Sequence, residues 1–227
     1  TRSFDLVFID PPGTAGLPEP EHATFDSILE NMENPLKELG RPIILVGHSF
    51  GGYQAARILE KGLLDIIGLV LIATPLSKEA FESLKAQYEK FKDSEMIRTE
   101  KQWSQNKTLN SMRDWFASYG PLFFSEKSFQ TGRKLIQEDL MSAACFVGAR
   151  NVDSHGDVLS VLKKSLISKI SIAGEKDNLV TAASIQSDAQ KGGLEFHIIK
   201  DAGHFINLDQ PEAVAKLIEN KFIDSTK

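Results

Sequence analysis

The sequence predicts an α/β fold in which a mostly parallel sheet is flanked by helices. Five short apolar runs alternate with helix-like segments, near residues 4–9, 42–46, 66–72, 169–173 and 195–199. These runs are apolar on both faces, which is typical of parallel strands covered by helices on both sides. With 227 residues, 41% of them apolar and 25% charged, the chain can bury one substantial core.

The helix-like segments between these runs have recognisable ends. Residues 53–60 favour a helix that ends at Gly62, a residue suited to the left-handed conformation of a helix C-terminus. Pro35 breaks or restarts the first helix, and Asp209 and Glu212 are spaced to cap the last one. Apolar residues at helical spacing mark these two helices. They are Phe25, Ile28, Leu29 and Met32 in the first, and Val214, Leu217, Ile218 and Phe222 in the last.

A long interval, residues 76–140, contains no strand-like run. We predict that it forms a helical cap or lid inserted into a core made of residues 1–75 and 141–227. Ten of the nineteen aromatic residues lie in this interval, and a lid over an apolar pocket would need such side chains. The four apolar residues at helical spacing are expected to pack the first cap helix down: Phe81, Leu84, Tyr88 and Phe91. The candidate substrate-binding residues are Trp103, Trp115, Phe116 and Tyr119.

The run Gly47-His48-Ser49-Phe50-Gly51 directly follows the apolar run 42–46 and precedes the helix-like residues 53–60. A Gly-x-Ser-x-Gly run in this position is typical of a serine nucleophile on a sharp turn between a strand and a helix. Gly47 and Gly51 would let the strand and the helix approach closely, and the helix N-terminus offers unpaired N–H groups to a developing oxyanion. We expect His48 to pack locally. The alternative is a glycine-rich turn that contains an incidental serine.

A serine nucleophile needs a base and an acid that orients the base, and the C-terminal third offers both. Asp177 follows the run 169–173, and His204 follows the run 195–199. Both therefore lie just beyond the carboxyl ends of predicted parallel strands, where sites assemble. The competing acids are Glu175 and Asp201, and the competing bases are His22, His155 and His197.

Four landmarks make nearly the whole sequence resemble the alpha/beta-hydrolase superfamily. They are residues 4–13, the turn 47–51, the Gly-x-x-Asp turn 174–177, and Gly203-His204-Phe205 followed by Asp209-Gln210-Pro211-Glu212. The chain order Ser, Asp, His is also the order of that family.

The resemblance implies roles for the residues of these turns. Ser49 would be the nucleophile, His204 the general base and acid, and Asp177 the group that orients the imidazole and stabilises its charged form. The Gly-x-x-Asp spacing of the family selects Asp177 over its rivals. The Phe50 backbone N–H would be one oxyanion donor. The implied chemistry requires no metal and no organic cofactor.

The sequence departs from this family at its beginning. In the family, several strands and the loop that supplies the second oxyanion donor come before the part at which this sequence begins. One of those strands lies in the sheet between the equivalents of residues 4–9 and 42–46. The missing stretch would be roughly 40 residues of ordinary strands and loops. Because an open apolar edge is an aggregation hazard, we expect a removed N-terminal segment or a separate chain to complete the sheet.

Composition narrows the classes of partner. The net charge is 26 − 31 = −5 with no block of like charges, which argues against nucleic acid and membrane surfaces as partners and leaves a small-molecule substrate. The one cysteine, Cys145, lies in apolar surroundings and is expected to be packed, which fits a reducing, cytoplasmic compartment. No stretch approaches 18 uninterrupted apolar residues, and the first residues lack the pattern of a signal peptide.

These features together predict a serine hydrolase that cleaves a small, apolar or aromatic ester, lactone or thioester through an acyl-enzyme. A peptidase, a carbon–carbon bond hydrolase or an acyltransferase of the same family is the alternative, because cap and loops set the substrate and the fold does not. An aspartate-nucleophile enzyme is disfavoured because residue 49 is serine. The competing class is a non-catalytic protein that uses this fold to bind a ligand or a partner chain.

Overall fold

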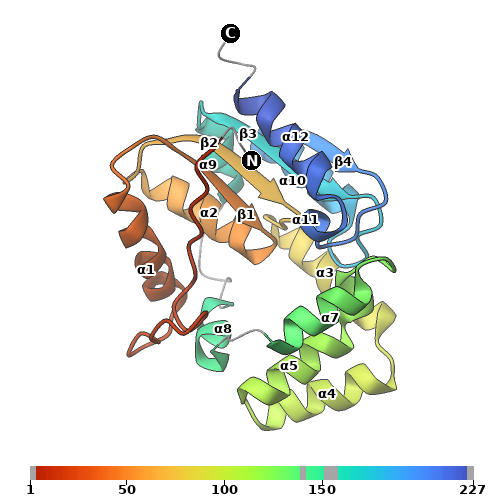
Figure 1. Ribbon diagram of the computed structural model, residues 1–227. Helices are drawn as coiled ribbons and strands as arrows, with labels where there is room; N and C mark the ends of the chain where they lie inside the picture. Colours follow the sequence, from red (N-terminus) through yellow and green to blue (C-terminus); the bar gives the residue numbers. More distant parts are fainter. Residues whose placement is uncertain (1–3, 139–141, 151–157, 224–227) are drawn as a thin grey trace.

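Four parallel strands form the sheet of the computed structural model, which describes residues 4–138, 142–150 and 158–223. The strands lie in the order β1-β2-β3-β4 (Figure 1). Their bounds are Ile43–His48 (β1), Ile66–Ile72 (β2), Ser168–Gly174 (β3) and Glu195–Ile199 (β4). Because all neighbouring pairs are parallel, the carboxyl ends of the strands meet at one edge of the sheet. The predicted fold class and four of the five predicted strands are confirmed.

The prediction of a fifth strand over residues 4–9 is wrong. In the structure this segment has no regular secondary structure, and the Phe8 side chain is 85% exposed. A strand forms only where a neighbouring strand satisfies its backbone N–H and C=O groups. In the described sheet β1 pairs with β2 and is an edge strand, and residues 4–9 do not pair with it.

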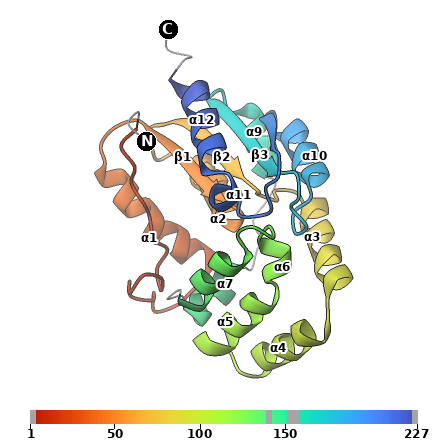
Figure 2. The ribbon, with the colours of Figure 1, turned by 45° about the vertical axis from the view of Figure 1, so that its right-hand side comes forward.

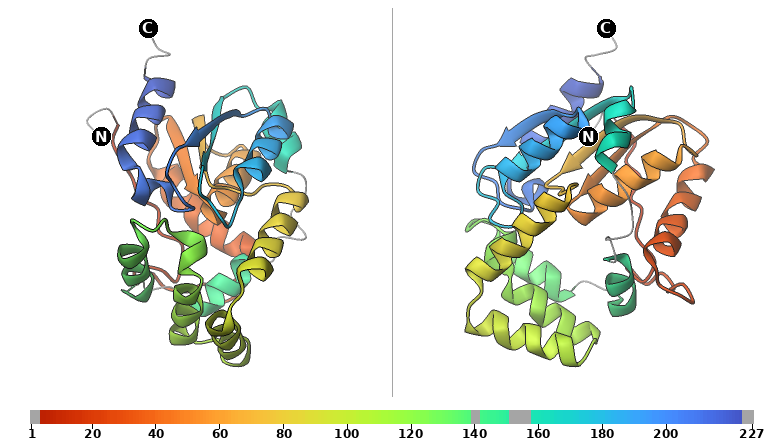
Figure 3. Two further views of the ribbon diagram at one scale, coloured as in Figure 1. Left: turned by 90° about the vertical axis from the view of Figure 1, so that its right-hand side faces the viewer. Right: turned by 180° about the vertical axis from the view of Figure 1, so that it is seen from behind.

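Helices cover both faces of the sheet, as the two views of Figure 3 show. One face carries α1 (Phe25–Glu38), α2 (Phe50–Lys61), α9 (Val158–Lys164) and α10 (Ala182–Gly192). The other face carries α11 (Ile206–Asp209) and α12 (Pro211–Phe222).

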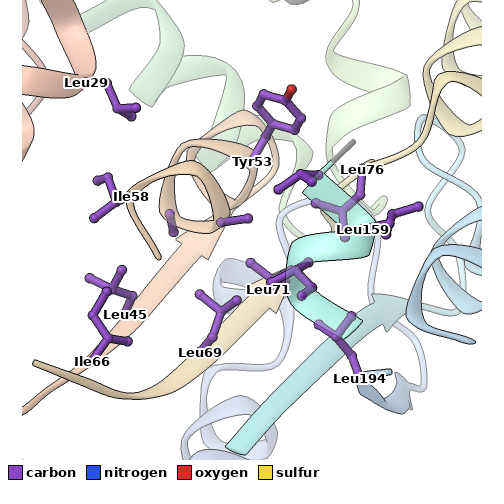
Figure 4. Close-up of a cluster of buried hydrophobic side chains, with 14 of the residues drawn as sticks. Leu29, Leu45, Tyr53, Ile58, Ile66, Leu69, Leu71, Leu76, Leu159 and Leu194 are labelled. Atoms are coloured by element: carbon purple, nitrogen blue, oxygen red, sulfur yellow. The ribbon is translucent and has the colours of Figure 1, made fainter. Parts of the chain in front are cut away.

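Strand β2 contributes alternate side chains to the cores on the two faces of the sheet. Leu69 and Leu71 pack into the core cluster of the first face, whereas Val70 and Ile72 pack into the cluster of the second. Every one of these four side chains is buried. Figure 4 shows members of the first cluster, among them Leu29, Leu45, Tyr53, Ile58, Ile66, Leu69, Leu71, Leu76, Leu159 and Leu194.

The chain between β2 and β3 forms helices. We call the first five of them, α3 to α7, the cap helices; Figures 1 and 2 show them packed below the sheet. Phe123, which ends one of these helices, meets the loop that follows β4, because its carbonyl oxygen accepts from the Phe205 N–H at 3.2 Å. The bounds are Lys78–Phe91 (α3), Ser94–Gln105 (α4), Leu109–Ser118 (α5), Gly120–Phe123 (α6), Phe129–Glu138 (α7) and Ala143–Ala149 (α8). Within the described residues, the length and apolarity that a membrane span requires are not found in any helix.

Two sequence signals for helix ends act differently in the structure. Pro35 lies inside α1 and does not break it. Proline removes one backbone hydrogen bond from the last turns, but Leu36, directly beyond it, is buried in the core and holds the turn in place. Asp209 and Glu212 do not cap α12: its N-cap is Gln210, which makes no side-chain cap hydrogen bond. The carboxylate of Asp209 bonds elsewhere, as described below.

Candidate functional site

Ser49 lies on a strained turn between β1 and α2. Its backbone has φ 52° and ψ −124°, a conformation that costs a non-glycine residue about 1–3 kcal/mol. The Ser49 N–H donates to the Ile72 carbonyl oxygen of the neighbouring strand at 2.8 Å, which ties the turn to the sheet. Strained backbone of this kind is the geometry of a nucleophile elbow.

Only one of the two glycines that we predict to allow close packing around Ser49 does so in the structure. A Cβ on Gly47 would overlap the backbone of Gly51 and Gly52, so Gly47 allows the close approach that we predict. A Cβ on Gly51 would meet no described atom within 4 Å, so the prediction for Gly51 is wrong. Gly52 is the second required glycine, because its Cβ would overlap the Thr74 side chain. The sequence contains both glycines, but only the position of Thr74 shows which one is needed.

His204 lies on the loop after β4, and its ring contacts Ser49 on the turn after β1. Its Nε2 lies 2.9 Å from Ser49 Oγ, and its Nδ1 lies 2.8 Å from Asp177 Oδ2. The ring is 2% exposed. With Nδ1–H donating to the carboxylate, Nε2 is left to accept from the serine hydroxyl. Three loops at the carboxyl ends of three strands thus join a hydroxyl, an imidazole and a carboxylate by two consecutive hydrogen bonds.

Asp177 is held by its own loop as well as by His204. Its second oxygen, Oδ1, accepts from the Leu179 N–H at 2.8 Å and from the Val180 N–H at 2.9 Å. Both oxygens of this buried carboxylate therefore have partners. The orientation of the carboxylate is fixed before any substrate binds.

The competing acids lie elsewhere. Glu175 is exposed, and its Oε2 accepts from the Asp201 N–H at 3.1 Å. The Asp201 carboxylate pairs with the Lys176 ammonium at 2.6 Å. That ammonium holds the pKa of Asp201 below its usual range.

The competing histidines do not join the site either. His197, on β4, pairs with Glu195 at 2.8 Å, and the His22 side chain is exposed. His155 lies outside the described residues.

His48 packs behind the site, as predicted, and it also makes a contact that the sequence does not reveal. Its ring lies 4.9 Å from the His204 ring and 4.7 Å from the Phe205 ring. Its Nε2–H donates to the His204 carbonyl oxygen at 2.9 Å. Burial, and then the nearby His204, lower the pKa of His48 to about 3, so this ring is a neutral donor near neutral pH.

Phe50 is the first residue of α2, directly after Ser49. An N–H at this position has no acceptor within its own helix, and the positive end of the helix dipole adds to it. The Phe50 ring turns toward Phe25 and Tyr53, with centroids 6.1 and 6.0 Å away. The Phe50 ring therefore packs against the core, whereas its backbone N–H lies at the N-terminus of α2.

The four candidate substrate-binding residues lie at different distances from Ser49, Asp177 and His204. Phe116 is the nearest by ring contacts: it lies 5.9 Å from Phe123, whose ring is 6.2 Å from His204. Trp115 packs 4.9 Å from Phe116, and Trp103 stacks 6.0 Å from Trp115. Trp103 is thus separated from His204 by three other rings.

Tyr119, the fourth candidate, is buried against its neighbours. Its ring packs edge-on to Tyr88 at 4.8 Å. Burial raises the pKa of Tyr119. Leu84, Tyr88 and Phe91 pack against the hydrophobic cluster that contains Tyr119, as their helical spacing predicts for the first cap helix.

The chain belongs to the alpha/beta hydrolase family, whose model matches residues 1–217. This membership supports hydrolase activity as a class. A comparison with curated proteins gives no match.

Solved structures of the same fold include enzymes of several kinds. An esterase from Thermogutta terrifontis is 22% identical, with a TM-score of 0.65 over 93% of this chain and 76% of that chain. A meta-cleavage product hydrolase from Pseudomonas fluorescens is 16% identical, with a TM-score of 0.67 over 95% and 78%. A structure from work on carboxylesterases of Nitrososphaera gargenis is 15% identical, with a TM-score of 0.72 over 96% and 79%. At these identities the likeness shows the fold.

Proposed function

We propose that this protein is a serine hydrolase that cleaves a small carboxylic ester, lactone or thioester. The observation that carries the proposal is the pair of hydrogen bonds at His204, 2.9 Å to Ser49 Oγ and 2.8 Å to Asp177 Oδ2. An incidental serine on a glycine-rich turn has no reason to face a buried imidazole that is itself held by a buried carboxylate.

The first half of the proposed reaction forms an acyl-enzyme. Ser49 Oγ attacks the substrate carbonyl carbon while His204 Nε2 takes the hydroxyl proton, and Asp177 stabilises the imidazolium that results. The carbonyl oxygen becomes an oxyanion that the Phe50 N–H stabilises at the N-terminus of α2. His204 then gives its proton to the leaving oxygen or sulfur, and the carbon–heteroatom bond breaks.

The second half releases the acyl group. Water attacks the acyl carbonyl while His204 Nε2 takes one of its protons, and the proton passes to Ser49 Oγ as the ester bond to the enzyme breaks. The free acid leaves, and the serine hydroxyl is restored. This route uses no metal and no organic cofactor.

The cap supports a small apolar or aromatic substrate. Phe123 brings aromatic surface to within 6.2 Å of the imidazole that would face the bound substrate, and Phe116 packs on Phe123 at 5.9 Å. A covered apolar pocket favours substrates of modest size over polymers. The esterases among the similar structures agree with ester cleavage, and the meta-cleavage product hydrolase keeps carbon–carbon bond hydrolysis as the alternative reaction.

A fluorophosphonate probe tests the proposal, because it labels only an activated serine. We expect one label, at Ser49, and turnover of aryl esters that falls roughly 10⁴-fold or more in Ser49→Ala. The matched control is Ser104→Ala, since the exposed Ser104 hydroxyl bonds only within its own helix. Wild type and Ser49→Ala with equal esterase activity would refute the assignment, and an unlabelled protein that binds small ligands would favour the non-catalytic class.

A further inference from the structure

Asp209 is a buried carboxylate that the proposed reaction does not use. It ends α11, is 2% exposed, and makes no ion pair with any described residue. Its Oδ2 accepts from the Gly203 N–H at 2.7 Å, and its Oδ1 accepts from the Ser125 hydroxyl at 2.6 Å. Leaving the oxygens of a buried carboxyl group unpaired is costly, so the two donors matter to the fold or to the site.

The two donors belong to different parts of the molecule. Gly203 directly precedes His204, so Oδ2 holds the loop that carries the imidazole. Ser125 follows α6 and lies between cap helices α6 and α7, so Oδ1 holds the cap. Figure 2 shows α11 next to the connection between these two helices.

Further contacts join the same two segments. The Phe205 N–H donates to the Phe123 carbonyl oxygen at 3.2 Å, and the Phe124 and Phe205 rings stack at 4.8 Å. The backbones are so close that a Cβ on Gly203 would come within 3.0 Å of the Ser125 nitrogen. Residues 123–125 and 203–205 therefore form one packed unit.

We propose that Asp209 is a positioning residue that couples the cap to the catalytic base. One carboxylate holds both segments, so the position of His204 Nε2 relative to Ser49 Oγ depends on whether the Ser125 segment of the cap is docked. The inference rests on the proposed function for the role of His204, but the coupling itself is a property of the fold. Simple helix capping does not account for Asp209, because the carboxylate reaches back to Gly203 and across to the cap.

Leaving-group dependence is a kinetic readout that separates positioning from stability. An alkyl ester needs His204 to protonate its poor leaving group, whereas an aryl ester such as p-nitrophenyl acetate does not. A displaced imidazole therefore slows the alkyl ester more than the aryl ester. A loss of folded protein would slow both by the same factor.

Three variants use this readout. In Asp209→Ala we expect kcat/KM for ethyl acetate to fall roughly 10- to 100-fold, and the aryl-to-alkyl ratio of kcat/KM to rise about tenfold. The ratio of kcat/KM is compared because both esters form the same acetyl-enzyme and differ only in the steps up to its formation. Asp209→Asn recovers most of the loss, because its carbonyl accepts from Gly203 and its amide donates to Ser125. Ser125→Ala produces part of the effect alone and no additional effect in the Asp209→Ala background.

Hydrogen exchange tests the coupling without any activity. Ser125→Ala changes only the cap side, yet we expect faster exchange of the amides of residues 203–205, while the control Ser104→Ala leaves them unchanged. Unchanged exchange in Ser125→Ala overturns the coupling even in an active enzyme. Equal losses for both esters, or additive effects of the two substitutions, overturn the positioning role. Failure of the proposed function would appear separately, as a wild-type protein that neither labels nor turns over either ester.

Discussion

The two sides of Ser49 differ in how many hydrogen-bonded groups the described residues place there. On the side of β3 and β4, Asp177 is held by two backbone N–H groups and His204 by Asp177, and His48 at the end of β1 reaches across to the His204 carbonyl oxygen. On the side of β1 and α2, the strand is an edge of the described sheet, and Val46 on it is 53% exposed. The only oxyanion donor we assign there is the Phe50 N–H.

This difference separates proton transfer from oxyanion stabilisation. The proton-transfer side consists of buried groups whose hydrogen bonds fix one another, so each group has one orientation. The nucleophile side depends on backbone geometry: the strained φ of Ser49 and the close approach at Gly47 and Gly52. Substitutions on the first side should therefore impair proton transfer. Substitutions on the second side should impair the stabilisation of the oxyanion by a single amide.

The largest expected effect comes from the acid. In Asp177→Asn the amide cannot hold the imidazole in the tautomer that leaves Nε2 free to accept, so we expect kcat to fall about 10⁴-fold with little change in KM. Steady-state kinetics on an aryl ester measure this loss. Glu175→Gln, two residues away in the same turn, is the matched control and should keep full activity. If kcat falls in Glu175→Gln and not in Asp177→Asn, the acid is Glu175 and the assignment of Asp177 is wrong.

A smaller effect is expected from the one assigned oxyanion donor. Replacing Phe50 with phenyllactic acid turns its peptide N–H into an ester oxygen and leaves the side chain unchanged. Removing one such donor typically lowers kcat about 10²- to 10³-fold. Phe50→Ala keeps the N–H and is the control, with its stability checked because the Phe50 ring packs on Phe25 and Tyr53. If the ester variant keeps its kcat, the Phe50 N–H does not stabilise the oxyanion.

The parts that the sequence could predict are those that depend on local patterns. Four strands follow from runs that are apolar on both faces, and the residues at the ends of these strands include Ser49, Asp177 and His204. The contacts of Gly52 with Thr74 and of Asp209 with Ser125 could not be predicted, because they join segments far apart in the chain. Residues 4–9 show the opposite case: a strand-like run makes no strand where no neighbour pairs with it.

The smallest expected effect concerns His48 and appears as a dependence of stability on pH. The folded protein keeps this ring neutral, with its pKa lowered to about 3, whereas the unfolded chain protonates it as the pH falls through its ordinary value of 6.5. The stabilisation is therefore complete above pH 6.5 and is lost as the pH falls toward 3. At about 1.4 kcal/mol per pH unit, roughly 2–3 kcal/mol of unfolding free energy should be lost between pH 7.5 and 4.5. His48→Gln keeps a donor for the His204 carbonyl oxygen but cannot titrate, so its urea-unfolding free energy should fall less over this range, while the exposed control His22→Gln follows the wild type. Equal pH slopes for His48→Gln and wild type would mean that this ring does not titrate differently in the folded and unfolded states.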